Sequence, residues 1–141
     1  MKIFLDTNVL AGAAATRGFC ADVLKEIIES QRLVVSDPLL IELKRVLRRK
    51  FQVPTRLIND FIGVVKQDSV FSVPGGLPEA AIRDQNDLAI LSSALNGNAA
   101  LFVTGDKELL ELGKLQDMEI MSPRMCWERL RQRPRNKPGK S

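Results

Sequence analysis

The sequence predicts an α/β protein with three layers, α/β/α, in which helices cover both faces of a mostly parallel central sheet of four or five strands. Short apolar runs such as residues 3–5 and 33–36 indicate buried strands, because they are brief and lack polar alternation. Longer segments between such runs have apolar residues at helical spacing. This alternation, without a tight hairpin signal, favours parallel pairing.

The first half of the chain contains the first two strand signals and three helix signals. Residues 11–18, after the first strand, are small and predict a flexible loop. The apolar spacing of residues 19–30 predicts a helix. The second strand is followed by Asp37-Pro38, and proline is favoured in the first turn of a helix. Val53-Pro54-Thr55 should end that helix and start the next.

The second half repeats the alternation. Its expected strands are residues 69–73, 100–103 and 119–121. Its expected helices are residues 86–95, a short segment after Thr104-Gly105-Asp106, and a last segment that starts at Ser122-Pro123. The chain length suits one domain, which we expect over residues 1–130. Residues 131–141 should form a basic, disordered tail.

The amino-acid composition limits the chemistry that the protein can use and its expected cellular location. The chain has no histidine and only two cysteines, which excludes histidine bases and argues against a zinc site. A bound metal would then need oxygen ligands, which suits Mg²⁺ or Mn²⁺. No apolar run reaches the roughly 20 residues of a membrane span. The first strand also leaves no room for a leader, so we expect a cytoplasmic protein with free thiols and no membrane partner.

Two acids follow expected strands directly. Asp6 comes after strand 3–5, and Asp106 follows strand 100–103 through Thr104-Gly105. In open α/β sheets, ligands bind beyond the carboxyl ends of the strands, so both acids are candidate metal ligands or catalytic groups. Each also has a structural explanation, as a turn residue or a helix cap.

Other acids lie on helices that can lean over the same edge. Glu42 lies near the boundary of an apolar stripe, although for this residue alone pairing with Arg45 or Arg49 is the favoured explanation. Asp84 and Asp87 precede or begin a helix, where capping and the helix dipole also favour acids. Asp87 is the better ligand candidate, and Asp84 is a ligand, a cap or a supporting group. Clustered carboxylates repel one another, and a divalent cation relieves that repulsion.

These motifs resemble the PIN domain family over about residues 1–130. The segments that carry the resemblance, in the family's order, are Leu5-Asp6-Thr7-Asn8-Val9-Leu10, the helix that contains Glu42, Asp84-Gln85-Asn86-Asp87-Leu88-Ala89-Ile90, and Val103-Thr104-Gly105-Asp106-Lys107-Glu108-Leu109-Leu110. Ser122-Pro123 before the last helix is similar to the toxin group within that family.

The resemblance implies a metal-dependent endoribonuclease that cuts single-stranded RNA and leaves a 5′-phosphate. It assigns catalysis and the binding of Mg²⁺ or Mn²⁺ to four acids, Asp6, Glu42, Asp87 and Asp106. It assigns supporting roles to Asn8, Asp84 and Thr104. It also implies the toxin of a type II toxin–antitoxin pair, with a small antitoxin of the VapBC type as partner, and a homodimer, because the family is often dimeric.

An acidic site attracts metal ions but repels RNA phosphates, so positive charge must come from elsewhere. The helix that contains Glu42 has a basic face, formed by Lys44, Arg45, Arg48 and Arg49. We expect this face to contact RNA. Six of the 21 basic residues follow Glu128, so the tail is a second candidate, although a solvated tail that aids solubility explains its charge equally.

Four other functions stay open at this stage. A housekeeping RNA-processing nuclease and a catalytically silent PIN-like binding module would carry the same motifs. A receiver domain also has an acidic magnesium pocket, but here Asp6 has no acidic neighbour. A haloacid-dehalogenase-like phosphatase needs an acid two residues after its nucleophilic aspartate, and this chain has Asn8 there.

Overall fold

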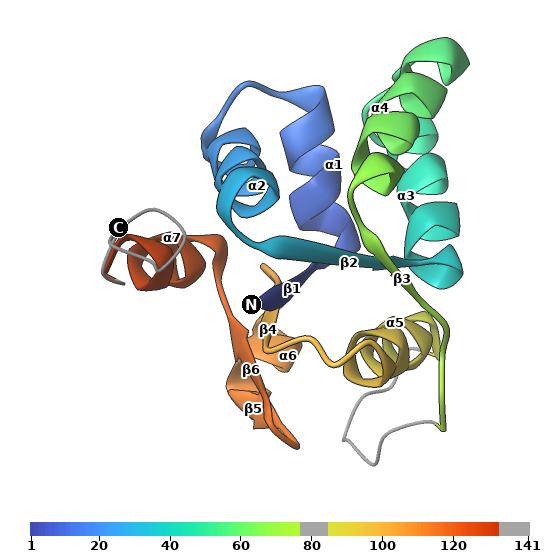
Figure 1. Cartoon of the computed structure of the whole chain (residues 1–141). Helices are drawn as coiled ribbons and strands as arrows, with labels where there is room; N and C mark the ends of the chain where they lie inside the picture. The colour runs from blue at the N-terminus through green and yellow to red at the C-terminus, as the bar shows by residue number, and fades with distance from the viewer. Residues whose placement is uncertain (77–84, 133–141) are drawn as a thin grey trace.

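The computed structural model describes residues 1–76 and 85–132, which form a central sheet between two layers of helices (Figure 1). The described residues build a six-stranded sheet in the order β3-β2-β1-β4-β6-β5. The strands are β1 (Lys2–Leu5), β2 (Arg32–Ser36), β3 (Val70–Ser72), β4 (Leu101–Val103), β5 (Lys114–Leu115) and β6 (Met118–Met121). The pairs from β3 across to β6 are parallel, and β5 is antiparallel to β6.

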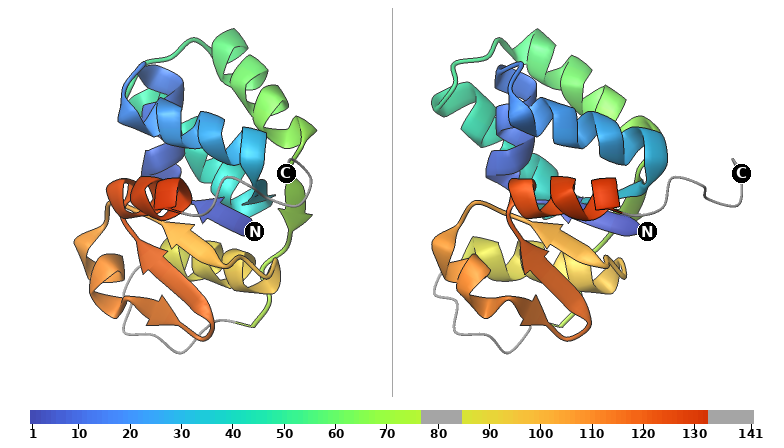
Figure 2. Two further views of the ribbon diagram at one scale, coloured as in Figure 1. Left: turned by 60° about the vertical axis from the view of Figure 1, so that its left-hand side comes forward. Right: turned by 90° about the vertical axis from the view of Figure 1, so that its left-hand side faces the viewer.

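Helices cover both faces of this sheet, as the sequence predicts. The helices are α1 (Thr7–Ala15), α2 (Phe19–Ser30), α3 (Asp37–Arg49), α4 (Thr55–Gln67), α5 (Gln85–Asn96), α6 (Lys107–Leu112) and α7 (Pro123–Gln132). The first four lie over one face, whereas α5 and α6 lie over the other (Figures 1 and 2). Helix α7 lies against α2. The predicted three-layer α/β/α architecture is therefore confirmed.

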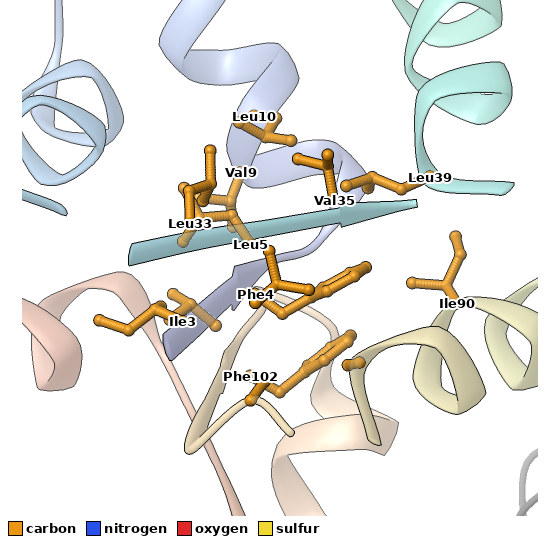
Figure 3. Close-up of a cluster of buried hydrophobic side chains, with 14 of the residues drawn as sticks. Ile3, Phe4, Leu5, Val9, Leu10, Leu33, Val35, Leu39, Ile90 and Phe102 are labelled. Carbon is orange, nitrogen blue, oxygen red and sulfur yellow. The ribbon is translucent and has the colours of Figure 1, made fainter. Parts of the chain in front are cut away.

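Strand β1 lies in the middle of the core. Ile3, Phe4 and Leu5 have no exposed surface. The Phe4 ring stacks on Phe102 of the neighbouring β4, with the ring centroids 5.4 Å apart. Figure 3 shows these rings among side chains from β2 and from helices on both faces of the sheet. Because apolar side chains contact β1 from both faces and both neighbouring strands, its end is a fixed point in the structure.

The expected loop over residues 11–18 is wrong for most of its length, because α1 continues to Ala15. Alanine is the strongest helix former, and the run of small residues therefore extends the helix instead of loosening the chain. Leu10 and Ala11 are completely buried, so this helix also has a packed face. Only residues 16–18 are left to connect α1 with α2.

The sheet has one strand more than predicted, because β5 and β6 form a hairpin that the sequence did not reveal. Their connection is Gln116-Asp117, and Gln116 has a φ of 54°. That backbone region favours glycine and asparagine, so a glutamine there gives no turn signal. The predicted strand 119–121 corresponds to β6, which starts one residue earlier at Met118.

Both cysteines are free thiols, as predicted, and burial raises the pKa of Cys126 to about 11. In the part of the chain that the structure describes, no helix has the length and apolar character needed to cross a membrane. Helix α7 includes Arg131, whose guanidinium lies over the Trp127 ring at 4.7 Å. The rest of the expected tail, residues 133–141, lies outside the described residues.

The end of α5 comes so close to the sheet that only glycine fits at position 97. A Cβ atom on Gly97 would lie 2.8 Å from Cγ1 of Val34 and 3.0 Å from the side chain of Ser72, and both neighbours are buried. We expect Gly97→Ala to lower the free energy of unfolding by about 1–3 kcal/mol in a urea titration, because packed neighbours must shift.

Gly63 provides the matched control, since nothing lies within 4 Å of a Cβ placed there on the exposed side of α4. Gly63→Ala should raise the free energy of unfolding by about 0.5–1 kcal/mol through helix propensity. If Gly97→Ala were as stable as the unmodified protein, α5 would not be held against the sheet at this point.

Candidate active site

A small cavity lies beyond the carboxyl ends of β1 and β4. These strands pair in parallel with Leu5 opposite Val103, so the residues that follow them emerge side by side. The cavity has a volume of about 100 Å³. Its wall includes the four predicted acids, Asp6, Glu42, Asp87 and Asp106, together with Thr7, Asn8 and Arg45. Four acids that are remote in sequence therefore meet at one place.

Asp6 is the most buried of these acids, with 8% of its surface exposed. Its Oδ1 accepts a hydrogen bond of 2.8 Å from the Thr7 amide, which caps α1, and its Oδ2 accepts one of 2.7 Å from the Thr104 hydroxyl. Burial is the main cause that raises the pKa of Asp6 above its ordinary value, and Asp106 and Glu42 add repulsion. The two hydrogen bonds act in the opposite direction but do not cancel these effects.

Thr104 links Asp6 to Asp106. The Thr104 hydroxyl donates to Asp6 and also accepts a hydrogen bond of 3.0 Å from the Asp106 amide. Oδ1 of Asp106 accepts hydrogen bonds from the amides of Glu108 and Leu109, at 2.8 and 3.3 Å, and so caps α6. Asp106 thus has its expected capping role and also lines the cavity. The capping role is compatible with the predicted role of Asp106 as a metal ligand, which stays a prediction.

Glu42 is also both paired and placed at the cavity. Leu39, Leu43 and Leu47 hold the inner face of α3 in the core. Glu42 therefore lies beside that face, and 23% of its side chain is exposed. The Arg45 guanidinium binds it through Nη2, which lies 2.7 Å from each carboxylate oxygen. The pairing predicted from sequence is confirmed for Arg45.

The acids near α5 are described only in part. Asp87 is half-buried in the first turn of α5 and lines the cavity. Asp84 lies outside the described residues, so its predicted supporting role stays a prediction. Asn8 is exposed, in the first turn of α1, and reaches the cavity wall. Its position suits the supporting role expected for it.

Thr7 is a cavity residue that the sequence analysis did not select. It is 5% exposed, and its hydroxyl oxygen is the one buried side-chain polar atom among the described residues that has no hydrogen-bond partner. Buried hydroxyls are nearly always satisfied, so an unpaired one at this cavity is consistent with a bound water or ligand atom. The signal was available in Asp6-Thr7-Asn8, where a hydroxyl directly follows a buried carboxylate.

The donor set suits a hard divalent cation, because carboxylate oxygens from four elements face one cavity. The side chains are not drawn together into a binding geometry, since no three acids within residues 1–76 and 85–132 are close enough to hold an ion. Glu42 is held by Arg45 in this arrangement, with Nη2 of Arg45 2.7 Å from Oε2 of Glu42. The residues therefore fit a metal chemically, and side-chain rotation would complete the site.

A basic hollow adjoins the acidic cavity. It has a volume of about 280 Å³ and is lined by Ile41, Lys44, Arg45, Arg48 and Arg49. Arg45 lines both the hollow and the cavity. The predicted basic face thus exists next to the acids, but nothing in the geometry identifies its ligand.

The fold and the cavity define an α/β protein whose carboxylates cluster beyond the carboxyl ends of parallel strands. Comparison with protein families agrees with this class, since the model of the PIN domain matches residues 2–108. The chain belongs to the PIN domain family. No curated protein sequence matches the chain.

Two solved structures have a similar fold. VapBC2 from Rickettsia felis, bound to a DNA fragment from its promoter, gives a TM-score of 0.59 at 15% identity, over 86% of this chain and 98% of that one. VapBC-1 from nontypeable Haemophilus influenzae also gives 0.59, at 19% identity, over 88% of this chain and 99% of that one. At such identities the likeness shows the fold alone.

The raised pKa of Asp6 makes the stability of the metal-free protein depend on pH. The folded chain holds this proton more tightly than the unfolded chain. Stability should therefore fall as the pH rises from the ordinary aspartate value of 3.8 through the raised pKa, and stay low above it. We expect Asp6→Asn to melt above the unmodified protein at pH 7 in chelator, with an advantage that shrinks as the pH falls towards 3.8.

Thermal unfolding over a series of pH values measures this difference. Asp60→Asn is the control, because it removes an exposed carboxylate of α4 that does not line the cavity. A melting advantage of Asp6→Asn that stayed constant with pH would contradict the role of Asp6 ionisation.

Proposed function

We propose that this protein is a divalent-metal-dependent endoribonuclease that hydrolyses phosphodiester bonds of single-stranded RNA. The observation that carries the proposal is the convergence of Asp6, Glu42, Asp87 and Asp106 on one cavity in a chain of the PIN domain family. Carboxylates that line one cavity repel one another, and a divalent cation would relieve that repulsion and stabilise the charge that develops during attack on a phosphodiester.

The four acids would hold Mg²⁺ or Mn²⁺ through their oxygens. The bound ion would supply an activated water and charge stabilisation at the phosphate. Asp6 is already oriented for this role, because the Thr7 amide and the Thr104 hydroxyl fix its two oxygens. Thr104 also restrains the Asp106 backbone, so one hydroxyl positions two ligands.

The basic hollow would receive the RNA backbone. Lys44, Arg48 and Arg49 lie beside the cavity on the same helix as Glu42, so a strand whose phosphates contact them can reach the acids. Binding of this kind weakens with salt, because phosphate contacts release counterions. The apolar Ile41, which is 68% exposed in the same hollow, offers a surface for a base.

We further propose that the protein acts in the cytoplasm as the toxin of a type II toxin–antitoxin pair. The support is its family membership and its fold similarity to two proteins that were solved as VapBC assemblies. A small antitoxin would be its partner, and a homodimer is a further expectation. A housekeeping nuclease would differ in one respect, since its expression without a partner would not stop growth.

Cleavage of single-stranded RNA should require Mn²⁺ or Mg²⁺. A labelled RNA incubated with the purified protein should be cut at internal positions with either ion and stay intact with excess chelator, because the acids then lack the cation that activates water. Cutting that persisted in chelator would contradict the proposed mechanism.

Asp6→Asn and Asp87→Asn should each lower the cleavage rate at least about a hundredfold, as expected when a ligand of a catalytic metal is lost. The same RNA assay and a circular dichroism spectrum measure activity and folding together. Asp60→Asn is the matched control for the change in charge, since Asp60 is exposed and does not line the cavity. If Asp6→Asn cut RNA at the unmodified rate, Asp6 would be only a helix cap.

A further inference from the structure

Arg45 lies where the basic hollow meets the acidic cavity. It is the one basic side chain among the described residues that line the acidic cavity, and it also lines the basic hollow beside it. Its guanidinium holds Glu42 with Nη2 at 2.7 Å from both oxygens and Nε at 3.2 Å from Oε1. Among the described residues that line the cavity, the one basic side chain is thus bound to one of the acids expected to hold a cation.

This pairing relieves charge repulsion in the metal-free cavity. Glu42 and Asp106 both act on Asp6 as like charges, and Asp6 is almost completely buried. A guanidinium bound to Glu42 offsets part of that negative charge from within the chain. Glu42 is held by Arg45 in this arrangement, in which no three acids of the described residues are close enough to hold an ion.

We propose that Arg45 is the internal counter-ion of this site and that a divalent cation displaces it from Glu42. The cation and the guanidinium compete for the same carboxylate, so each weakens the binding of the other. The displaced guanidinium is then at the boundary between the acids and the basic hollow, where it can bind an RNA phosphate in bidentate fashion. The inference rests on the proposed function, because it assumes that the acids hold a metal.

The two roles of Arg45 have effects of opposite sign. Arg45→Gln frees Glu42 and removes a positive charge, so Mn²⁺ should bind about three- to tenfold more tightly. The same variant lacks the phosphate contact, so the KM for RNA at saturating Mn²⁺ should rise about tenfold. If Arg45 merely supported the fold of the site, its replacement would weaken both Mn²⁺ binding and RNA binding. Arg45→Lys keeps the positive charge but lacks the planar guanidinium that donates two parallel hydrogen bonds. Its Mn²⁺ affinity should therefore stay close to that of the unmodified protein.

Isothermal titration with Mn²⁺ alone, on the full chain, measures the affinity without relying on activity. Arg129→Gln is the matched control, because it breaks another arginine–glutamate pair, Arg129–Glu119 at 2.8 Å, and changes the net charge equally. Neither of those residues lines the cavity. Arg129→Gln should therefore leave the Mn²⁺ affinity within about twofold, since exposed charges act weakly over distance.

The outcomes separate this inference from the proposed function. Tighter Mn²⁺ binding by Arg45→Gln, but not by Arg129→Gln, supports the counter-ion role. Equal or weaker binding by Arg45→Gln overturns that role, while the proposed nuclease stands if the unmodified protein binds Mn²⁺ and cuts RNA. An unchanged KM overturns the phosphate contact. If the unmodified protein binds no Mn²⁺, both proposals fail.

Discussion

The burial of one carboxylate, that of Asp6, sets the conditions for the rest of the cavity. Strand β1 ends in the middle of the sheet, so the residue that follows it cannot reach bulk water easily. A buried carboxylate needs hydrogen-bond donors, and the neighbouring elements supply them through the Thr7 amide and the Thr104 hydroxyl. Phe4 stacks on Phe102 at a paired position of β1 and β4, and the register of these strands brings Thr104 beside Asp6.

The structural roles of the acids do not exclude the functional role proposed for them. Asp6 and Asp106 cap α1 and α6, and Glu42 forms an ion pair along α3, yet all three line the same cavity. Capping fixes one oxygen of a carboxylate and leaves another lone pair free to point elsewhere. A helix start beyond a parallel strand therefore places an acid and orients it in one step, and this is why a cap at such a position is also a candidate ligand.

The sequence predicted the layers, the parallel strands and the four acids, because buried strands and amphipathic helices leave strong periodic signals. It failed where the chain gives no such signal. The alanines of α1 looked like a loop, and the turn at Gln116 has no glycine to mark it. The spacing of Glu42 and Arg45 was enough to suggest their pairing. It could not show that Arg45 lines both the acidic cavity and the basic hollow, because that depends on how α3 packs. The unpaired Thr7 hydroxyl likewise depends on neighbours remote in sequence.

The bond between Thr104 and Asp6 joins residues that are 98 positions apart. During synthesis, β1 emerges from the ribosome long before β4, so the first acid of the cavity must wait for most of the chain before its partners exist. Contacts between such distant residues form late, because closing the long intervening loop costs entropy before the contact can stabilise the fold. For a protein proposed to cut RNA, this order has a practical meaning: the cutting site is incomplete while most of the protein's own message is being translated.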